Sequence, residues 1–212
     1  MSKSIANLAL ATAIGLFVSF ALASVPADVV GRADPDWPCI QRKVPELSIA
    51  SVWQGPPADE ALTNWRDDAE VAGIVANAAP RRIPIEEATA AIAAFAEGLD
   101  AAAKEAKLTA LFAGLFQTLD RERSDVMAGI ERYARAQTQL AEGIREDQAA
   151  LSDLRTANPE SPEVAARNDE LLAAVRVFDD RRASLTFVCE VPTLIEQRLF
   201  ELSRAIQTEL NR

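Results

Sequence analysis

The feature that most constrains the fold is a long stretch in which apolar residues recur in alternating steps of three and four. From about Lys104 to Ala157 no proline interrupts the chain. This spacing is typical of the a and d positions of a coiled coil, so the stretch is predicted to be one long helix. Its repeating face covers four heptads and holds Val126, Ile130, Tyr133, Gln137, Leu140, Ile144, Asp147, Leu151 and Leu154.

A second run with the same period follows a turn. Residues 158–162 read Asn-Pro-Glu-Ser-Pro, which favours a turn, and Ser161 is predicted to cap the next helix with Pro162 at its first position. That helix has its own repeating face of Val164, Asn168, Leu171, Val175, Phe178, Arg182 and Leu185. Two heptad helices joined by a short turn predict an antiparallel hairpin over about residues 120–188.

The rest of the chain also favours helices. Glycine is scarce, at 8 of 212 residues, and the apolar fraction of 49% contains much alanine. We therefore expect an all-α helical bundle over residues 58–212, from which the hairpin projects. Its other helices are predicted at about 58–80, 85–99 and 192–210. Residues 24–57 hold several prolines and are predicted to form an extended arm with a short helix near 45–53.

The N-terminus has the pattern of an export signal. Lys3 precedes an apolar run from Leu8 to Ala23, which ends in Ala-Leu-Ala. A basic start, an apolar run and a small-x-small end are typical of a secretory signal peptide, here residues 1–23. The run is short for a membrane span, although an uncleaved anchor helix is the alternative. We expect a periplasmic or secreted protein without a transmembrane segment in its mature form.

Two cysteines, Cys39 and Cys189, are the only ones in the chain. In an oxidising compartment such a pair is most simply a disulfide. Each cysteine precedes a Val-Pro pair, so each is expected to mark a helix start that the bond would pin to the other. A redox-active pair is the alternative, which the absence of a C-x-x-C motif disfavours.

The composition argues against several classes of function. The net charge is −10 and the sequence shows no basic stripe, which disfavours nucleic-acid binding. The chain has no histidine, which removes histidine-based metal and haem sites and histidine-activated nucleophiles. Adjacent carboxylates such as Asp67 and Asp68 are interpreted as solvated helix surface. We therefore expect no cofactor, no metal site and no enzymatic activity.

Two functional hypotheses follow. The favoured one is a non-enzymatic scaffold or adaptor that binds another protein in the cell envelope, because an exposed helical hairpin suits docking along a helix or groove. The apolar stretch 108–119 is its best candidate surface. The alternative is a small-molecule binding module with a pocket near three clustered tryptophans. The residues singled out for these interactions are Leu108, Phe112, Phe116, Trp37, Trp53 and Trp65.

Overall fold

The computed structural model describes Asp34 and residues 36–212. The predicted signal peptide and residues 24–33 of the predicted arm lie outside these described residues. All regular structure in the described part is helical, which confirms the all-α fold class. The helices are α1 (Ile49–Val52), α2 (Ala61–Asn64), α3 (Ala69–Ala78), α4 (Ile85–Glu97), α5 (Ala101–Ala157) and α6 (Pro162–Leu210), with a 3₁₀ turn, η2, at Trp65–Asp67. None of these helices is long and apolar enough to cross a membrane.

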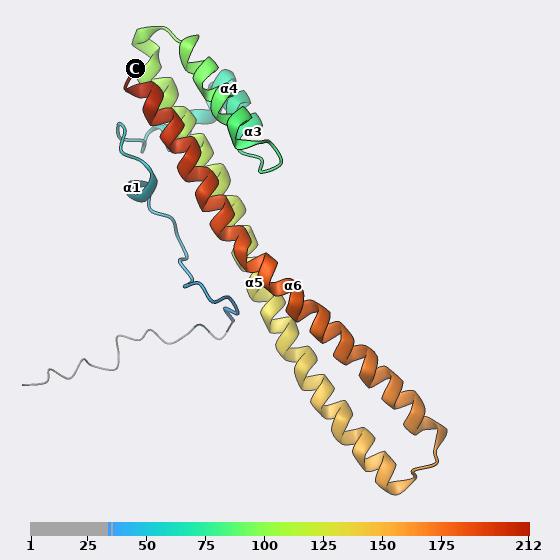
Figure 1. Ribbon diagram of the computed structural model, residues 1–212. Coiled ribbons are helices and arrows are strands. Elements are labelled where there is room, and N and C mark those ends of the chain that lie inside the picture. The colour runs from blue at the N-terminus through green and yellow to red at the C-terminus, as the bar shows by residue number, and fades with distance from the viewer. Residues whose placement is uncertain (1–33, 35) are drawn as a thin grey trace, which may run out of the picture. The chain divides into compact units, whose positions relative to one another are not determined.

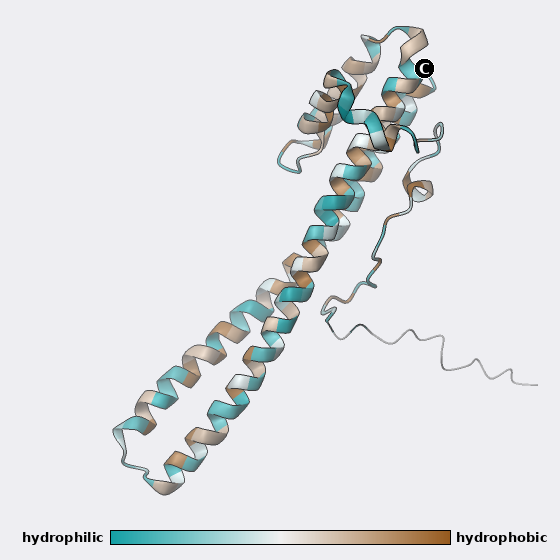
Figure 2. Ribbon diagram, turned by 180° about the vertical axis from the view of Figure 1, so that it is seen from behind, coloured by the Kyte–Doolittle hydropathy of each residue, from teal (hydrophilic) through white to brown (hydrophobic). Residues whose placement is uncertain are grey.

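The two long helices α5 and α6 form the predicted antiparallel hairpin (Figure 1). Ser161 caps α6 by accepting a hydrogen bond from the Glu163 amide, and Pro162 occupies the first helical position, as expected. Ile130, Ile144 and Leu151 are buried between the helices, and most other predicted seam residues are half-buried. The buried stripe agrees with the alternation of apolar and polar residues along both ribbons in Figure 2.

Polar contacts across the seam fix its register. The hydroxyl of Tyr133 donates to the carbonyl of Arg181 at 2.9 Å, and Nε2 of Gln137 donates to the carbonyl of Phe178 at 3.1 Å. Nearer the turn, Arg155 donates to the Asn168 side chain at 2.7 Å. Two predicted seam residues, Asp147 and Arg182, are exposed, so their charged groups stay in water.

The prediction of a separate final helix from Pro192 to Leu210 is wrong. Helix α6 runs without a break through Pro192, which is buried inside it. A proline within a helix removes one backbone hydrogen bond, so tertiary packing must hold the helix together at this point. The apolar face of α6 continues on both sides of the proline, from Cys189 to Ile195 and Leu199, and packs along α5.

The body of the protein is a bundle at the open end of the hairpin. Helices α3 and α4 pack on the N-terminal part of α5 and the C-terminal part of α6 (Figure 1). Trp53 stacks on Phe112 with ring centroids 4.0 Å apart. The guanidinium of Arg198 is buried and donates to the carbonyls of Ala78 and Ile83, at the end of α3 and in the loop after it. These carbonyls lack helical partners, so the contact satisfies groups that would otherwise be costly to bury.

The predicted helix over about 58–80 is divided in the structure. Trp65 turns into the core, where its indole N–H donates to Oε1 of Gln117 at 2.9 Å. Asp68 is extended, and its carboxylate accepts hydrogen bonds from the amides of Glu70 and Val71. An N-cap of this kind begins a new helix and ends the previous one. The interpretation of Asp68 as solvated helix surface therefore missed its role as the N-cap of α3.

Gly114 should be the least replaceable glycine of the core. A Cβ at this position would lie 2.6 Å from Cγ2 of Val75 and 2.9 Å from the Trp65 ring. We expect Gly114→Ala to lower the free energy of unfolding by about 1–2 kcal/mol, because overpacking outweighs the gain in helix propensity. Gly73→Ala in α3 is the control, since a Cβ there meets nothing within 4 Å. It should stabilise by up to about 1 kcal/mol in urea denaturation.

The Asp68 cap should also give a dependence on pH. The amide of Val71, followed by Lys107 as the charged partner, lowers the pKa of this carboxyl. Because the folded pKa lies below the unfolded value of about 4, the stabilisation is complete above that pH and is lost as pH falls through the folded pKa. Asp68→Ala should cost about 1 kcal/mol at pH 7. The gap between variant and wild type should narrow at pH 3, and an unchanged gap would contradict the role of the carboxylate.

Candidate functional site

The described part of the arm is fastened across the middle of the hairpin. We call this region the waist and define it as residues 123–135 of α5 and 182–196 of α6. Cys39 and Cys189 form a disulfide that spans 150 residues of sequence, with their Cα atoms 5.6 Å apart. The predicted pairing is confirmed. On the chain-entropy model, closing a loop of this length stabilises by about 5 kcal/mol.

The bond does not join two helix starts, as the sequence had suggested. Cys189 lies well inside α6, and Cys39 lies in an irregular part of the arm. The Gln41 side chain donates to the carbonyl of Cys189, which adds a polar contact beside the disulfide. The covalent link therefore holds an extended segment against the side of a continuous helix.

A buried arginine provides the second fastening. Arg123 of α5 is only 2% exposed. Its guanidinium pairs with Glu196 of α6 at 2.5 Å and donates to the carbonyl of Val44 at 2.6 Å. The guanidinium has several donors in a fixed plane, so it can bind a carboxylate and an arm carbonyl together. Arg123 thus connects α5, α6 and the arm at one point.

Ion pairs at the surface, most of them between half-buried side chains, complete the attachment of the arm. Lys43 pairs with Asp34 and Glu131, at 2.6 Å in each case, and Arg135 pairs with Asp36 at 2.7 Å. The hydrogen bond from Lys43 lowers the pKa of Asp34, and the same bond raises the pKa of Lys43. Such pairs are largely solvated, so they orient the arm more than they stabilise it.

The arm and α6 enclose a groove of about 390 Å³ at the waist. Its lining is mostly apolar and consists of Pro38, Cys39, Ile40, Gln41, Arg182, Leu185, Thr186, Cys189 and Glu190. Ile40 is fully exposed and Phe187 is 73% exposed, and each lies within two residues of a disulfide cysteine. The waist therefore combines a rigidly held groove with large apolar side chains in solvent.

The apolar stretch 108–119 lies inside the protein. Leu108 and Phe112 are fully buried, and Phe116 is 8% exposed. These side chains pack against Trp53, α3 and the C-terminal part of α6 in a single core. These apolar side chains are thus buried in the core of the body, and they do not form an exposed surface for a partner.

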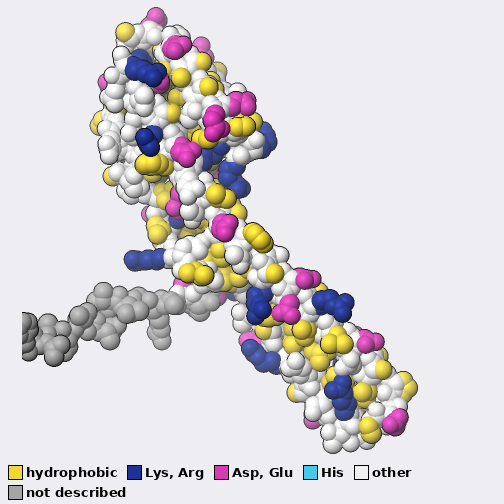
Figure 3. Space-filling model, viewed as in Figure 1, with side chains coloured by type: hydrophobic (Ala, Val, Ile, Leu, Met, Phe, Trp, Pro, Cys, Tyr) yellow, Lys and Arg dark blue, Asp and Glu magenta, His cyan; other side chains and the backbone are white. Residues whose placement is uncertain are grey.

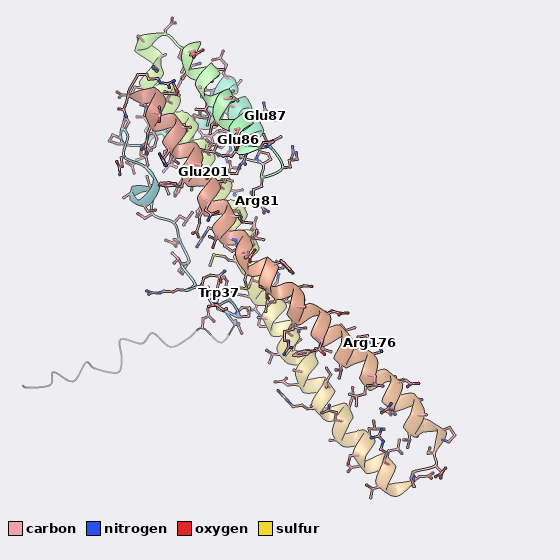
Figure 4. All side chains as sticks on the ribbon, viewed as in Figure 1. Trp37, Arg81, Glu86, Glu87, Arg176 and Glu201 are labelled. Carbon is pink, nitrogen blue, oxygen red and sulfur yellow. A yellow bond between two sulfur atoms is a disulfide. The ribbon has the colours of Figure 1, made fainter. Side chains whose placement is uncertain are left out.

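The three tryptophans have separate places. Trp53 and Trp65 are buried in the body, and Trp53 donates its indole N–H to the carbonyl of Pro56. Trp37 lies beside the waist (Figure 4), where its indole N–H donates to the carbonyl of Gln41 at 2.7 Å. Trp65 also borders an open groove of about 590 Å³ beside Asp68 and Lys107. Each indole therefore has a structural partner, as large aromatic residues with a polar atom generally do.

Sequence reasoning missed Arg123, Ile40 and Phe187. Arg123 precedes the heptad seam, and no local pattern distinguishes it from the exposed arginines around it. Ile40 and Phe187 could have been noticed as large apolar residues next to the predicted disulfide. Their exposure, however, depends on how the arm and α6 pack. No family model matches this sequence, and no similar protein is found among curated proteins or solved structures.

Arg123 should be essential for the attachment of the arm. We expect Arg123→Ala to lower the free energy of unfolding by about 2–3 kcal/mol, because it removes the hydrogen bonds of a buried guanidinium to Glu196 and to the carbonyl of Val44. Arg121→Ala is the matched control, since Arg121 is exposed on the same helix. Urea denaturation measures the stability, and hydrogen exchange of residues 40–47 reports the arm. Equal effects of the two variants would show that Arg123 holds nothing in place.

Proposed function

We propose that this protein is an exported, non-enzymatic helical adaptor that binds a partner protein in the cell envelope. The disulfide and the lack of a membrane-spanning helix among the described residues are compatible with an exported protein. The observation that carries the proposal is the waist groove, whose apolar lining includes the fully exposed side chain of Ile40. Phe187, which is 73% exposed, follows the lining residue Thr186 in α6. An apolar groove with a large apolar side chain exposed in its lining is typical of a site of protein interaction.

The structure of the waist favours a protein segment as the ligand. The disulfide and Arg123 hold the arm in place, so the groove is formed before binding and little ordering entropy is lost. Its lining offers apolar contacts along α6, with Arg182 and Glu190 as polar groups on the same helix. An extended or helical segment with an apolar anchor suits such a groove.

The test is site-specific photo-crosslinking in cells. A photoreactive amino acid is placed at Ile40 or Phe187 of the full-length chain, with exposed Thr208 at the far end of α6 as the control position. A partner should be captured from the first two positions and not from the third. The captured protein is then purified, and its affinity is measured for wild type, Ile40→Asp and Thr208→Asp.

We expect Ile40→Asp to weaken binding at least tenfold, because it places a charge in an apolar contact. Thr208→Asp, which introduces the same charge elsewhere, should bind as wild type does. Capture in equal amount from all three positions, or equal affinity of the two variants, would exclude the waist as the binding surface.

A further inference from the structure

The face of the hairpin that carries α3 and α4 in the body continues toward the turn, where no other described residues cover it. Glu122 of α5 pairs with Arg81 at 2.9 Å, and Arg198 of α6 binds the loop that follows α3. Heptad steps keep one face along a coiled hairpin. From Glu122 such steps reach Gly129, Ala136, Gly143 and Ala150, and from Arg198 they reach Val191, Ser184, Val177 and Glu170. We call residues 129–150 and 170–188 on this side the open face.

The open face is apolar or small along its centre. Ala136 and Ala150 are exposed on α5, and Val177 and Val188 are 44% and 38% exposed on α6. Glycine within a helix costs about 1 kcal/mol relative to alanine, yet a Cβ on Gly143 would meet nothing within 4 Å. Packing among residues 36–212 therefore does not require Gly143, although its small size permits close approach of another helix.

Charges on the open face are arranged with opposite sign at its two ends. Near the waist it carries Arg132 and Arg181, and nearer the turn it carries Glu146 and Glu170. All four side chains are exposed, and within the described residues none of them forms an ion pair. A face with this pattern complements its own copy in reverse orientation, because each basic end then meets an acidic end.

A single two-fold axis can place the basic residues of both helices opposite the acidic residues of a second copy. Arg132 and Glu146 lie equally far from Gln139, and Arg181 and Glu170 are centred between Val175 and Arg176. The contacts of Tyr133 with Arg181 and of Gln137 with Phe178 place Gln139 level with Arg176. The two centres therefore coincide at one height along the hairpin, which Figure 4 shows at the labelled Arg176.

The length of the open face gives the same centre. The cover provided by the body ends at Glu122, where Arg81 binds, and α5 ends at Ala157. The point midway lies between Gln139 and Leu140. The uncovered length is about 50 Å at 1.5 Å per residue, so a reversed copy would bring its own turn up to the Pro80–Pro84 loop. Exposed Arg82 in that loop would then face the acidic Glu160 of the turn.

We propose that two copies of this chain associate through the open face as an antiparallel, two-fold symmetric dimer. In it α5 packs on α5 and α6 on α6, which forms a four-helix bundle with Arg132 opposite Glu146 and Arg181 opposite Glu170. A symmetric dimer of this kind uses the same patch on both copies. A face about 50 Å long and two helices wide buries roughly 2,000 Å² in total, which is sufficient for a stable dimer.

The experiment is analytical ultracentrifugation of the disulfide-bonded protein from about 1 to 100 μM, a range that spans common dimer affinities. Wild type should be a dimer at the upper concentrations. Gly143→Leu should weaken the dimer at least tenfold, because the added side chain occupies the close contact. It should leave the melting temperature of the monomer unchanged or higher. Ala149→Leu, at an exposed α5 position outside the open face, is the matched control.

Charge reversal tests the orientation. Arg132→Glu should weaken the dimer at least tenfold, and the second change Glu146→Arg in the same chain should restore it, because both pairs are then reversed together. Arg145→Glu changes the net charge equally at an exposed position outside the open face and should have no effect. A wild-type monomer throughout, or a dimer insensitive to Gly143→Leu and Arg132→Glu, would overturn the proposal. Either result would leave the proposal of partner binding at Ile40 standing, because that proposal is tested by crosslinking at a different surface.

Discussion

The pairing of α5 with α6 along one heptad seam is the interaction on which the rest of the structure depends. At one end of the pair, α3, α4 and the aromatic side chains pack over the same two helices and make a core around Phe112. In the middle, the arm is tied to both helices through Arg123 and Cys189. At the other end, the two helices pack only on one another within the described part of the chain. Loss of the seam would therefore remove the support of every other element.

The seam has limited apolar content, and its register depends on polar contacts. Gln137 and Tyr133 donate to backbone carbonyls of the opposite helix, so a shift along the seam would leave these groups unpaired. Surface charges of both signs are interspersed over the visible side of the hairpin (Figure 3). They keep the long helices soluble, and they also allow the charge pattern of one face to select a binding orientation.

The two proposals place different kinds of binding on different parts of one hairpin, with partner binding at the waist and dimerisation on the open face. The arm covers the region around Cys189 and presents Ile40 beside a groove. The open face continues from the side on which Arg198 and Glu122 contact the α3–α4 loop. A dimer through the open face would leave Ile40 in each copy accessible, so two partner segments could bind one assembly. Linked sites of this kind raise apparent affinity without additional contacts.

Spacing along the chain was enough to predict α5, the part of α6 up to about residue 188, their turn at Ser161 and Pro162, and the pairing of the two cysteines. The helices and the turn depend on local periodicity and capping chemistry, and two cysteines allow only one intramolecular pairing. The 108–119 stretch is apolar on much of its circumference, which already indicated burial on more than one side. Only the tertiary structure decided that α6 continues through Pro192 and that Asp68 begins a new helix. Each of these depends on residues distant in sequence that supply packing or hydrogen bonds, and their positions are set by the folded chain as a whole.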